Sequence, residues 1–202
     1  MGIYSTKTAW QRALNPFVAF CVRQKVHPDW FTYGALALSA LAGAAFFLAA
    51  TNRAWLLAVP LCAALRLIFN LLDGLIARAQ NSADAWGEAK NEFGDRAADA
   101  LIFSALGLSG YVDARIGLLA LVLILLVSYL GILGKAIGGA RVFGGVFGKG
   151  DRMISLSLFT AYPFFTGDLS SYNFYLGVAA LAATLTIIQR LRVIYGHAKS
   201  AR

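Results

Sequence analysis

One apolar segment of this chain ends in Asn70-Leu71-Leu72-Asp73-Gly74-Leu75-Ile76-Ala77-Arg78, and the next begins with Gly87, Asn91 and Asp95. Helical periodicity places Asn70, Asp73 and Ala77 on one face, and Asn91, Asp95 and Asp99 on another. Burying polar and acidic groups near a bilayer is expensive, so they indicate a functional site. Two such faces turned toward each other form a cage of oxygen ligands, which suits a hard divalent cation such as Mg²⁺.

The composition of the chain is that of an integral membrane protein. Of its 202 residues, 59% are hydrophobic and 14% are charged, and the mean hydropathy is +0.66. A soluble domain is nearer to about half apolar and about a quarter charged. The net charge of +8 does not indicate a nucleic-acid partner, because Lys and Arg gather at segment ends, where anionic headgroups or substrates would meet them. We expect an all-α membrane protein with a single domain, residues 1–202.

Apolar runs of about 20 residues predict about six transmembrane helices. They are Phe31–Ala50, Ala54–Arg78, Asn91–Val112, Arg115–Lys135, Asp151–Phe165 and Tyr172–Ile188. The fifth run is short for a bilayer, and its Tyr162-Pro163 pair predicts an early end or a kink.

The residues ahead of the first span predict a helix that lies in the membrane interface. Lys7–Val26 alternates charged residues with apolar and aromatic ones, which is typical of an amphipathic interfacial helix. The alternative is an ordinary packed surface helix. Residues 1–27 would thus form the interfacial helix, and residues 28–202 the helical bundle.

The distribution of basic residues predicts the orientation in the membrane. Lys and Arg concentrate in the N-terminal segment, the second-to-third and fourth-to-fifth connections, and the C-terminal tail. The opposite side has little beyond Arg53 and Arg115. We therefore expect an inner-membrane protein whose termini and motif face the cytoplasm. Met1–Lys7 lacks the apolar core of a cleavable signal peptide, so the first spans are expected to remain.

A glycine-rich connection with several cations follows the fourth predicted span. It runs from Gly138 to Arg152 and contains Arg141 and Lys149. Its glycines would let backbone N–H groups approach a phosphate, and its cations would neutralise that phosphate. A solvated loop that obeys the positive-inside bias is the alternative.

A lone arginine, Arg66, lies inside the second predicted span, one helical turn before Asn70. A charge at such a position needs a partner or a polar cavity. We predict that Arg66 pairs with Asp73 or another acid of the site, or contacts an anionic acceptor. The alternative is an arginine that snorkels to the interface, although Arg66 is several residues from either end of the span.

The motif resembles the signature of the CDP-alcohol phosphotransferase family, D-x2-D-G-x2-A-R-x8-G-x3-D-x3-D. Every interval agrees, because this chain reads Asn70-x2-Asp73-Gly74-x2-Ala77-Arg78-x8-Gly87-x3-Asn91-x3-Asp95. Two positions differ, since the first and third aspartates are Asn70 and Asn91 here. The segment Pro28-Asp29-Trp30-Phe31-Thr32 is also similar to the family's Pro-Asn-x-x-Thr before its first span. The resemblance implies six spans, an interfacial N-terminal helix, a cytoplasmic-facing site and a homodimer.

The resemblance also implies the roles of the site residues. Asp73 and Asp95 would hold one or two divalent cations, Mg²⁺ or Mn²⁺, together with the amide oxygens of Asn70 and Asn91, and Asp95 would be the catalytic base. The nucleotide would lie against Asn70, Gly74, Ala77, Arg78 and Gly87. The acceptor or its phosphate would meet the cations Arg66, Arg141, Lys149 and Arg152.

The two asparagines change the charge of the site. The family quartet would carry four formal negative charges, whereas this one carries two. We hypothesise that the chain binds one cation tightly, or a second one only with substrate present. Glu88 and Asp99 are nearby candidates to restore charge. The alternative is a protein that has lost catalysis.

The implied reaction moves a phosphatidyl group from CDP-diacylglycerol to the hydroxyl of a small polar alcohol, with or without a phosphate, and releases CMP. Transfer of a headgroup from a soluble CDP-alcohol to a lipid acceptor is one alternative, and a non-catalytic membrane protein that binds a nucleotide or lipid is another. A transporter is disfavoured, because transporter sites lie near the midplane. For the implied dimer, Gly107, Ser109 and Gly110 would permit close helix contacts.

Overall fold

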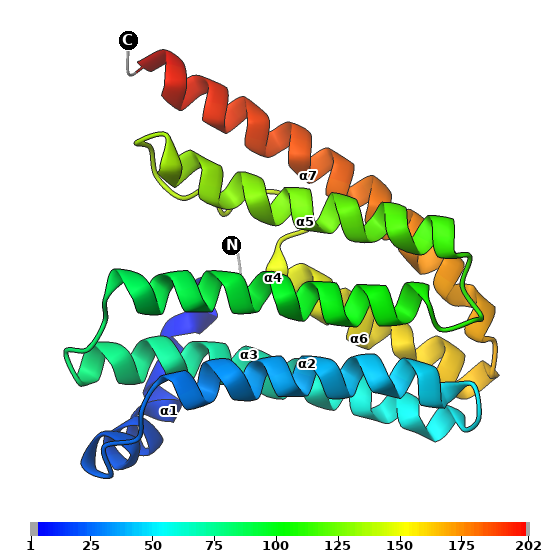
Figure 1. Cartoon of the computed structure of the whole chain (residues 1–202), viewed down its shortest axis with the longest axis horizontal. Helices are drawn as coiled ribbons and strands as arrows, with labels where there is room; N and C mark the ends of the chain where they lie inside the picture. Colours follow the sequence, from blue (N-terminus) through cyan, green and yellow to red (C-terminus); the bar gives the residue numbers. More distant parts are fainter. Residues whose placement is uncertain (1–3, 201–202) are drawn as a thin grey trace.

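The computed structural model is a bundle of seven α-helices and two short 3-10 helices, with no strand among residues 4–200 (Figure 1). It describes the backbone of residues 4–200 and the side chains of residues 14–199. The elements in chain order are α1 (Tyr4–Arg23), α2 (Asp29–Ala49), η1 (Arg53–Leu57), α3 (Ala58–Ala79), α4 (Ala85–Gly107), α5 (Ala114–Ala136), α6 (Lys149–Thr166), η2 (Leu169–Ser171) and α7 (Tyr172–Ser200).

Four segments are long and apolar enough to cross a membrane. These segments are Asp29–Ala49, Arg53–Ala79, Ala114–Ala136 and Leu169–Lys199. The other two predicted spans are present as α4 and α6, which have 23 and 18 residues and carry charged residues of the site. The all-α membrane fold is therefore confirmed, and the count of six spans stays a prediction.

The ends of the helices follow capping residues rather than hydropathy. The predicted span Asn91–Val112 is wrong at both ends, because the helix runs from Ala85 to Gly107. It begins early because the Asp84 side chain accepts a hydrogen bond from the Gly87 N–H at 2.6 Å and caps the first turn. The helix α6 runs through Pro163 and ends at Gly167, whose φ of 79° is left-handed. No early end occurs there, because a proline in the last turn removes one backbone donor without stopping the helix.

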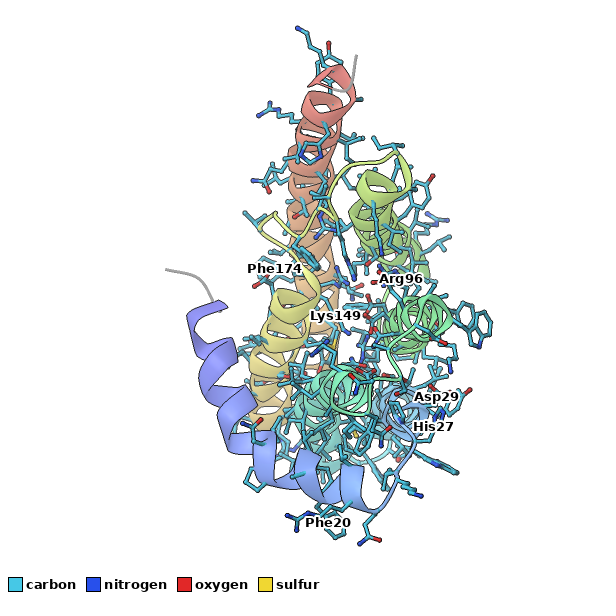
Figure 2. The ribbon with its side chains drawn as sticks, turned by 90° about the vertical axis from the view of Figure 1, so that its left-hand side faces the viewer. Phe20, His27, Asp29, Arg96, Lys149 and Phe174 are labelled. Atoms are coloured by element: carbon cyan, nitrogen blue, oxygen red, sulfur yellow. The ribbon has the colours of Figure 1, made fainter. Side chains whose placement is uncertain are left out.

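Helix α1 is the predicted N-terminal helix. Its Val18 and Cys21 are buried with Leu72 of α3, whereas Phe17 and Phe20 are 45% and 56% exposed. Phe20 points away from the bundle in Figure 2. One packed face and exposed aromatic residues on another fit an interfacial helix. Residues 1–3 and the side chains up to residue 13 lie outside the described ones, so the expectation for Met1–Lys7 stays a prediction.

Successive helices run back and forth, so the motif gathers at one end of the bundle. The connections α1–α2 and α3–α4 lie at the left in Figure 1, and those between α2 and α3, α4 and α5, and α6 and α7 lie at the right. The connection from α5 to α6 starts at the left and returns to the middle, where α6 begins. Helix α2 packs on α3 and α4, α5 packs on α4 and α7, and α3 packs on α6. The end of α3 and the start of α4 therefore meet at the left-hand end.

Glycines bring α4 and α5 into backbone contact at the opposite end. A Cβ added to Gly107 would lie 3.0 Å from the Cα of Gly117, and one added to Gly117 would lie 2.5 Å from the Cα of Gly107. The close contact expected of Gly107 is thus made within the chain, whereas the homodimer stays a prediction. Nearby, the ring of Tyr172 packs edge-on against Phe46 at 5.5 Å, and its hydroxyl bonds to Thr160 at 2.9 Å. This end of the bundle is packed with apolar and aromatic side chains, whereas the polar residues of the motif lie at the other end.

Candidate active site

The signature residues line a cavity of about 970 Å³ between the start of α2, the end of α3 and the start of α4. The seven signature residues before Asp95 are among its lining residues: Asn70, Asp73, Gly74, Ala77, Arg78, Gly87 and Asn91. We call this space the larger cavity. The first predicted face, Asn70, Asp73 and Ala77, is complete here, but of the second face only Asn91 lines this cavity. Asp95 and Asp99 line a different one, so the two faces do not form the single oxygen cage that their periodicity predicts.

Asp73 is held by neutral donors. Its Oδ2 accepts a hydrogen bond from the Thr32 hydroxyl at 3.1 Å and from the Asn91 amide at 2.6 Å, and its Oδ1 accepts from the Gly74 N–H at 2.5 Å. The residue is 5% exposed. The sequence did not indicate the Thr32 bond, although the resemblance of residues 28–32 to the family segment was a signal for it.

Asn70 has a buried amide nitrogen with no hydrogen-bond partner. The nitrogen and oxygen of an amide are assigned from their hydrogen bonds, so turning the group by 180° places the oxygen where a cation would satisfy it. One carboxylate, Asp73, and this amide oxygen fit one hard divalent cation. Among the described side chains, no group of three or more His, Cys, Asp or Glu is placed to hold a metal ion.

Gly74 leaves room for the guanidinium group of Arg78 at the wall of the larger cavity. A Cβ added to Gly74 would lie 3.2 Å from Nη1 of Arg78, so a side chain there would crowd the guanidinium. Arg78 lies one helical turn further along α3 and also lines the cavity. Its charge is therefore available to an anionic ligand.

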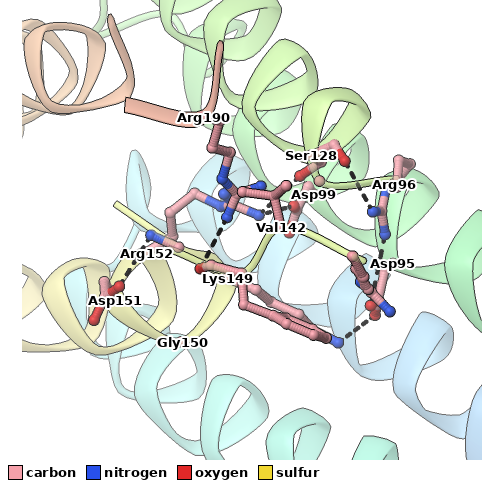
Figure 3. Close-up of a pocket in the computed structure, with 14 residues that line it drawn as sticks. Asp95, Arg96, Asp99, Ser128, Val142, Lys149, Gly150, Asp151, Arg152 and Arg190 are labelled. Carbon is pink, nitrogen blue, oxygen red and sulfur yellow. Dashed lines mark hydrogen bonds and ion pairs between the residues drawn. The ribbon is translucent and has the colours of Figure 1, made fainter. Parts of the chain in front are cut away.

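Asp95 lies in a second, smaller cavity of about 260 Å³, between α4, α6 and the glycine-rich connection (Figure 3). Its Oδ1 forms an ion pair with Lys149, and its Oδ2 lies 3.7 Å from Nη1 of Arg96. Lys149 also occupies the centre of the molecule in Figure 2. Burial lowers the pKa of the Lys149 ammonium, and the negative charge of Asp95 opposes that shift.

Asp99, one turn beyond Asp95, is clamped by two buried arginines. Its Oδ1 accepts from Arg66 at 3.0 Å and its Oδ2 from Arg152 at 2.6 Å. Arg66 also donates to the backbone oxygen of Asp95 at 3.3 Å, and Arg152 donates to the Ser128 hydroxyl at 3.2 Å. The three ionised side chains are 1–2% exposed.

This clamp decides between the alternatives for Arg66. Arg66 pairs with an acid of the site as predicted, but the acid is Asp99 rather than Asp73. Arg152 lines the smaller cavity, whereas Arg66 lines neither of the two cavities. The hypothesis that Asp99 restores charge to the cation site does not fit this geometry, because both of its oxygens already accept from guanidinium groups.

Arg141 and Phe143 of the glycine-rich connection line both cavities. Arg141 forms an ion pair with Glu92, and its guanidinium carbon lies 4.8 Å from the centre of the Phe143 ring. These two residues form a shared wall between the cavities. The sequence predicted Arg141 and missed Glu92, whose position one turn before Arg96 gave no separate signal.

Glu88 lies at the exposed rim of the larger cavity. It accepts a hydrogen bond from the Lys135 ammonium at 2.5 Å, and this bond lowers the pKa of Glu88. Half of each side chain is exposed. The pair ties the start of α4 to the end of α5, and the hypothesis that Glu88 adds charge to the cation site stays a prediction.

Arg190 of α7 was not predicted at the site. Its guanidinium donates to the backbone oxygens of Gly144 at 2.9 Å, Val127 at 2.5 Å and Phe143 at 3.3 Å. It thereby holds the glycine-rich connection against α5. An arginine near the C-terminal end of a long helix looks like any basic tail residue, so the sequence carried no signal for this role.

Comparisons with known proteins identify relatives of the whole chain. No protein-family model matches it. The inner membrane protein YnbA of Escherichia coli K12 is 30% identical over 195 residues, which are 96% of each chain. The chain belongs to the family of YnbA. Phosphatidylinositol phosphate synthase of Streptomyces avermitilis is 28% identical over 149 residues, 71% of this chain and 59% of that one.

Solved structures show the same fold. Phosphatidylinositol phosphate synthase PgsA1 of Mycobacterium tuberculosis with CDP-DAG bound superposes with a TM-score of 0.75 at 22% identity, over 91% of this YnbA relative and 94% of PgsA1. The same enzyme with manganese and citrate gives a TM-score of 0.74 over 89% and 88%. The chain therefore shares the all-helical membrane fold of PgsA1.

Proposed function

We propose that this protein is a phosphatidyltransferase that moves the phosphatidyl group of CDP-diacylglycerol to the hydroxyl of a small polar alcohol and releases CMP. The observation that carries the proposal is the pair of adjoining cavities. One contains the nucleotide signature, the other contains Asp95, and both share the wall of Arg141 and Phe143. Two substrates bound in them would meet at Asp95.

The donor nucleotide is assigned to the larger cavity. Its phosphates would lie along the end of α3 near Arg78, with Asn70, Gly74, Ala77 and Gly87 against the rest of the nucleotide. A divalent cation, Mg²⁺ or Mn²⁺, would be held by Asp73 with help from Asn70 and Asn91, and would offset the charge of the pyrophosphate. Support comes from PgsA1, which was solved with CDP-DAG and with manganese. The expected contribution of Asp95 to this cation site is not supported by its position, because its carboxylate pairs with Lys149.

The acceptor is assigned to the smaller cavity. Its volume of about 260 Å³ suits a small polar molecule. Five cations and three acids line it: Arg96, Arg141, Lys149, Arg152 and Arg190, with Asp95, Asp99 and Asp151. This excess of positive charge favours an acceptor that carries a phosphate. Arg66 lies outside the cavity, so its effect on the acceptor would pass through Asp99 and Arg152.

The chemistry follows from the position of Asp95 in the smaller cavity. The acceptor hydroxyl oxygen attacks the phosphorus of the phosphatidyl group, and an oxygen–phosphorus bond forms. The bond from that phosphorus to the oxygen of CMP breaks, and CMP leaves with the electron pair. The hydroxyl proton passes to the Asp95 carboxylate, which acts as general base. Arg78 and Arg141 would neutralise phosphate charge as it develops.

The protein is further proposed to work in the inner membrane, with its site and termini toward the cytoplasm, as a homodimer. The name of YnbA supports the location. The cations at the motif end, which include Lys90, Lys135 and Lys149, support the orientation.

A product assay with purified protein tests the reaction. CDP-diacylglycerol is supplied with glycerol phosphate, inositol phosphate or their unphosphorylated alcohols, and CMP release and lipid products are measured by mass spectrometry. We expect CMP and a new anionic phospholipid with a phosphorylated acceptor. A second arm supplies soluble CDP-alcohols with diacylglycerol, and turnover there would reverse the donor assignment. CDP binding without turnover in either arm would identify a non-catalytic protein.

A further inference from the structure

We infer that Lys149 is a resident cation at Asp95, and that this chain therefore holds a single divalent cation, at the Asp73 end of the site. The inference rests on the proposed function, because it concerns the charge that the donor pyrophosphate meets. It goes further by assigning to a side chain the neutralising role of a second metal ion.

The first observation is the ion pair at Asp95. Lys149 is the first residue of α6, and the Gly148 N–H donates to the Asp151 carboxylate at 2.9 Å, which fixes the first turn. The ammonium of Lys149 is thereby brought to Oδ1 of Asp95, whose side chain is 8% exposed. The second oxygen of Asp95 faces Arg96. A divalent cation at Asp95 would have to displace the lysine and would be repelled by the arginine.

The second observation is the direct contact between Asp73 and Asn91. The amide nitrogen of Asn91 lies 2.6 Å from Oδ2 of Asp73. Two carboxylates at that separation would repel each other and would require a proton or a cation between them. The asparagine replaces that repulsion with a hydrogen bond. The junction between α3 and α4 is thus satisfied without a bridging metal ion.

The third observation is that groups able to bind one cation remain at the end of α3. The buried amide of Asn70 has an unpartnered nitrogen, and Asp73 receives its other bonds from neutral groups only. With Lys149 included, Asp73 and Asp95 leave a net charge of −1, whereas four aspartates with the same lysine would carry −3. One divalent cation already makes the net charge of this site positive, so binding of a second cation would be opposed.

Counting bound Mn²⁺ by electron paramagnetic resonance tests the inference in nanodiscs without nucleotide. We expect one Mn²⁺ per chain in the wild type and none in Asp73→Asn. Lys149→Met frees Asp95, so a second Mn²⁺ should bind with at least about tenfold higher affinity than in the wild type. Lys149→Gln is a second removal variant if the first does not fold, and Lys149→Arg keeps the cation and should keep the count at one.

Lys135→Met is the matched control. Lys135 also pairs with a carboxylate, Glu88, but at the exposed rim of the cavity, so its removal should leave the count at one. Two Mn²⁺ per chain in the wild type, no Mn²⁺ in the wild type, or equal counts in Lys149→Met and Lys135→Met would each overturn the inference. The counts do not depend on turnover, so CMP release in the product assay tests the proposed function separately.

Discussion

The Asp73 end of the site and the Asp99 end hold their carboxylates in opposite ways. Asp73 accepts hydrogen bonds from a hydroxyl, an amide and a backbone N–H, and it lines the larger cavity. Asp99 is enclosed by two arginines that are themselves buried. The first arrangement leaves the negative charge of Asp73 available to a ligand in the cavity. In the second, the two arginines neutralise the charge of Asp99 inside the bundle. Asp95 lies between the two ends and pairs with one lysine, Lys149. The negative charge that remains available to a bound ligand therefore increases from Asp99 through Asp95 to Asp73.

The largest effect is expected at Asp95, because Asp95 is the proposed general base. Asp95→Asn keeps the shape of the side chain and removes the proton acceptor. CMP release should fall by about 10²–10⁴-fold, while CDP binding measured by calorimetry stays close to that of the wild type. Asp113→Asn at the start of α5 is the control, because asparagine also caps helices. Full turnover in Asp95→Asn would remove Asp95 from the mechanism.

The next largest effect is expected at the Asp99 end. Asp99→Asn leaves two buried guanidinium groups without their counter-charge, and breaking such a pair costs about 3–5 kcal/mol of unfolding free energy. Denaturant unfolding in detergent measures it. The matched control is Asp168→Asn at an exposed turn, where surface substitutions change stability by no more than about 0.5 kcal/mol. Equal stability of the two variants would contradict a structural clamp.

A smaller effect is expected at the Asp73 end. Thr32→Val removes the hydroxyl that donates to Asp73 and keeps the shape, so the unfolding free energy should fall by about 0.5–1.5 kcal/mol. Thr166→Val at the exposed end of α6 is the control and should change it less. A loss as large as that of Asp99→Asn would show that the two ends do not differ in how tightly they hold their carboxylates.

The smallest effect is expected at the rim, where the Glu88–Lys135 pair is half exposed. Because its pKa is lowered in the folded state, Glu88 stabilises the fold above its ordinary pKa of about 4.3, and this contribution is lost as the pH falls through the lower folded value. Glu88→Gln should cost less than about 1 kcal/mol and remove this acid sensitivity. Unfolding from pH 7 to about pH 3 measures the difference, and an unchanged pH dependence would contradict the pairing.

The sequence predicted the helices and the meeting of Asn91 with the first motif face, because both depend on local periodicity. Helical spacing alone places Asn70 with Asp73, and Asn91 with Asp95, and the short connection between α3 and α4 makes the faces adjacent. The helix ends were less predictable, since α4 begins at the cap Asp84 rather than at the first apolar residue.

The partners of the acids could not be predicted from spacing. Asp95 and Asp99 lie one turn apart on the same helix, yet one pairs with Lys149 and the other with Arg66 and Arg152. These partners are 33 to 54 residues away in sequence and come from two other helices. Which cation reaches which acid depends on how α3 and α6 pack against α4, and local patterns do not contain that information.

The wall of Arg141 and Phe143 has a consequence for the energetics of binding. Because the same two side chains face both cavities, a ligand that displaces them in one cavity changes the shape of the other. Affinities for the two ligands are then coupled, and linkage requires the coupling to be equal in both directions. Displacing Arg141 would break its ion pair with Glu92, so that pair would contribute to the size of the coupling. A single loop would then link the two binding equilibria.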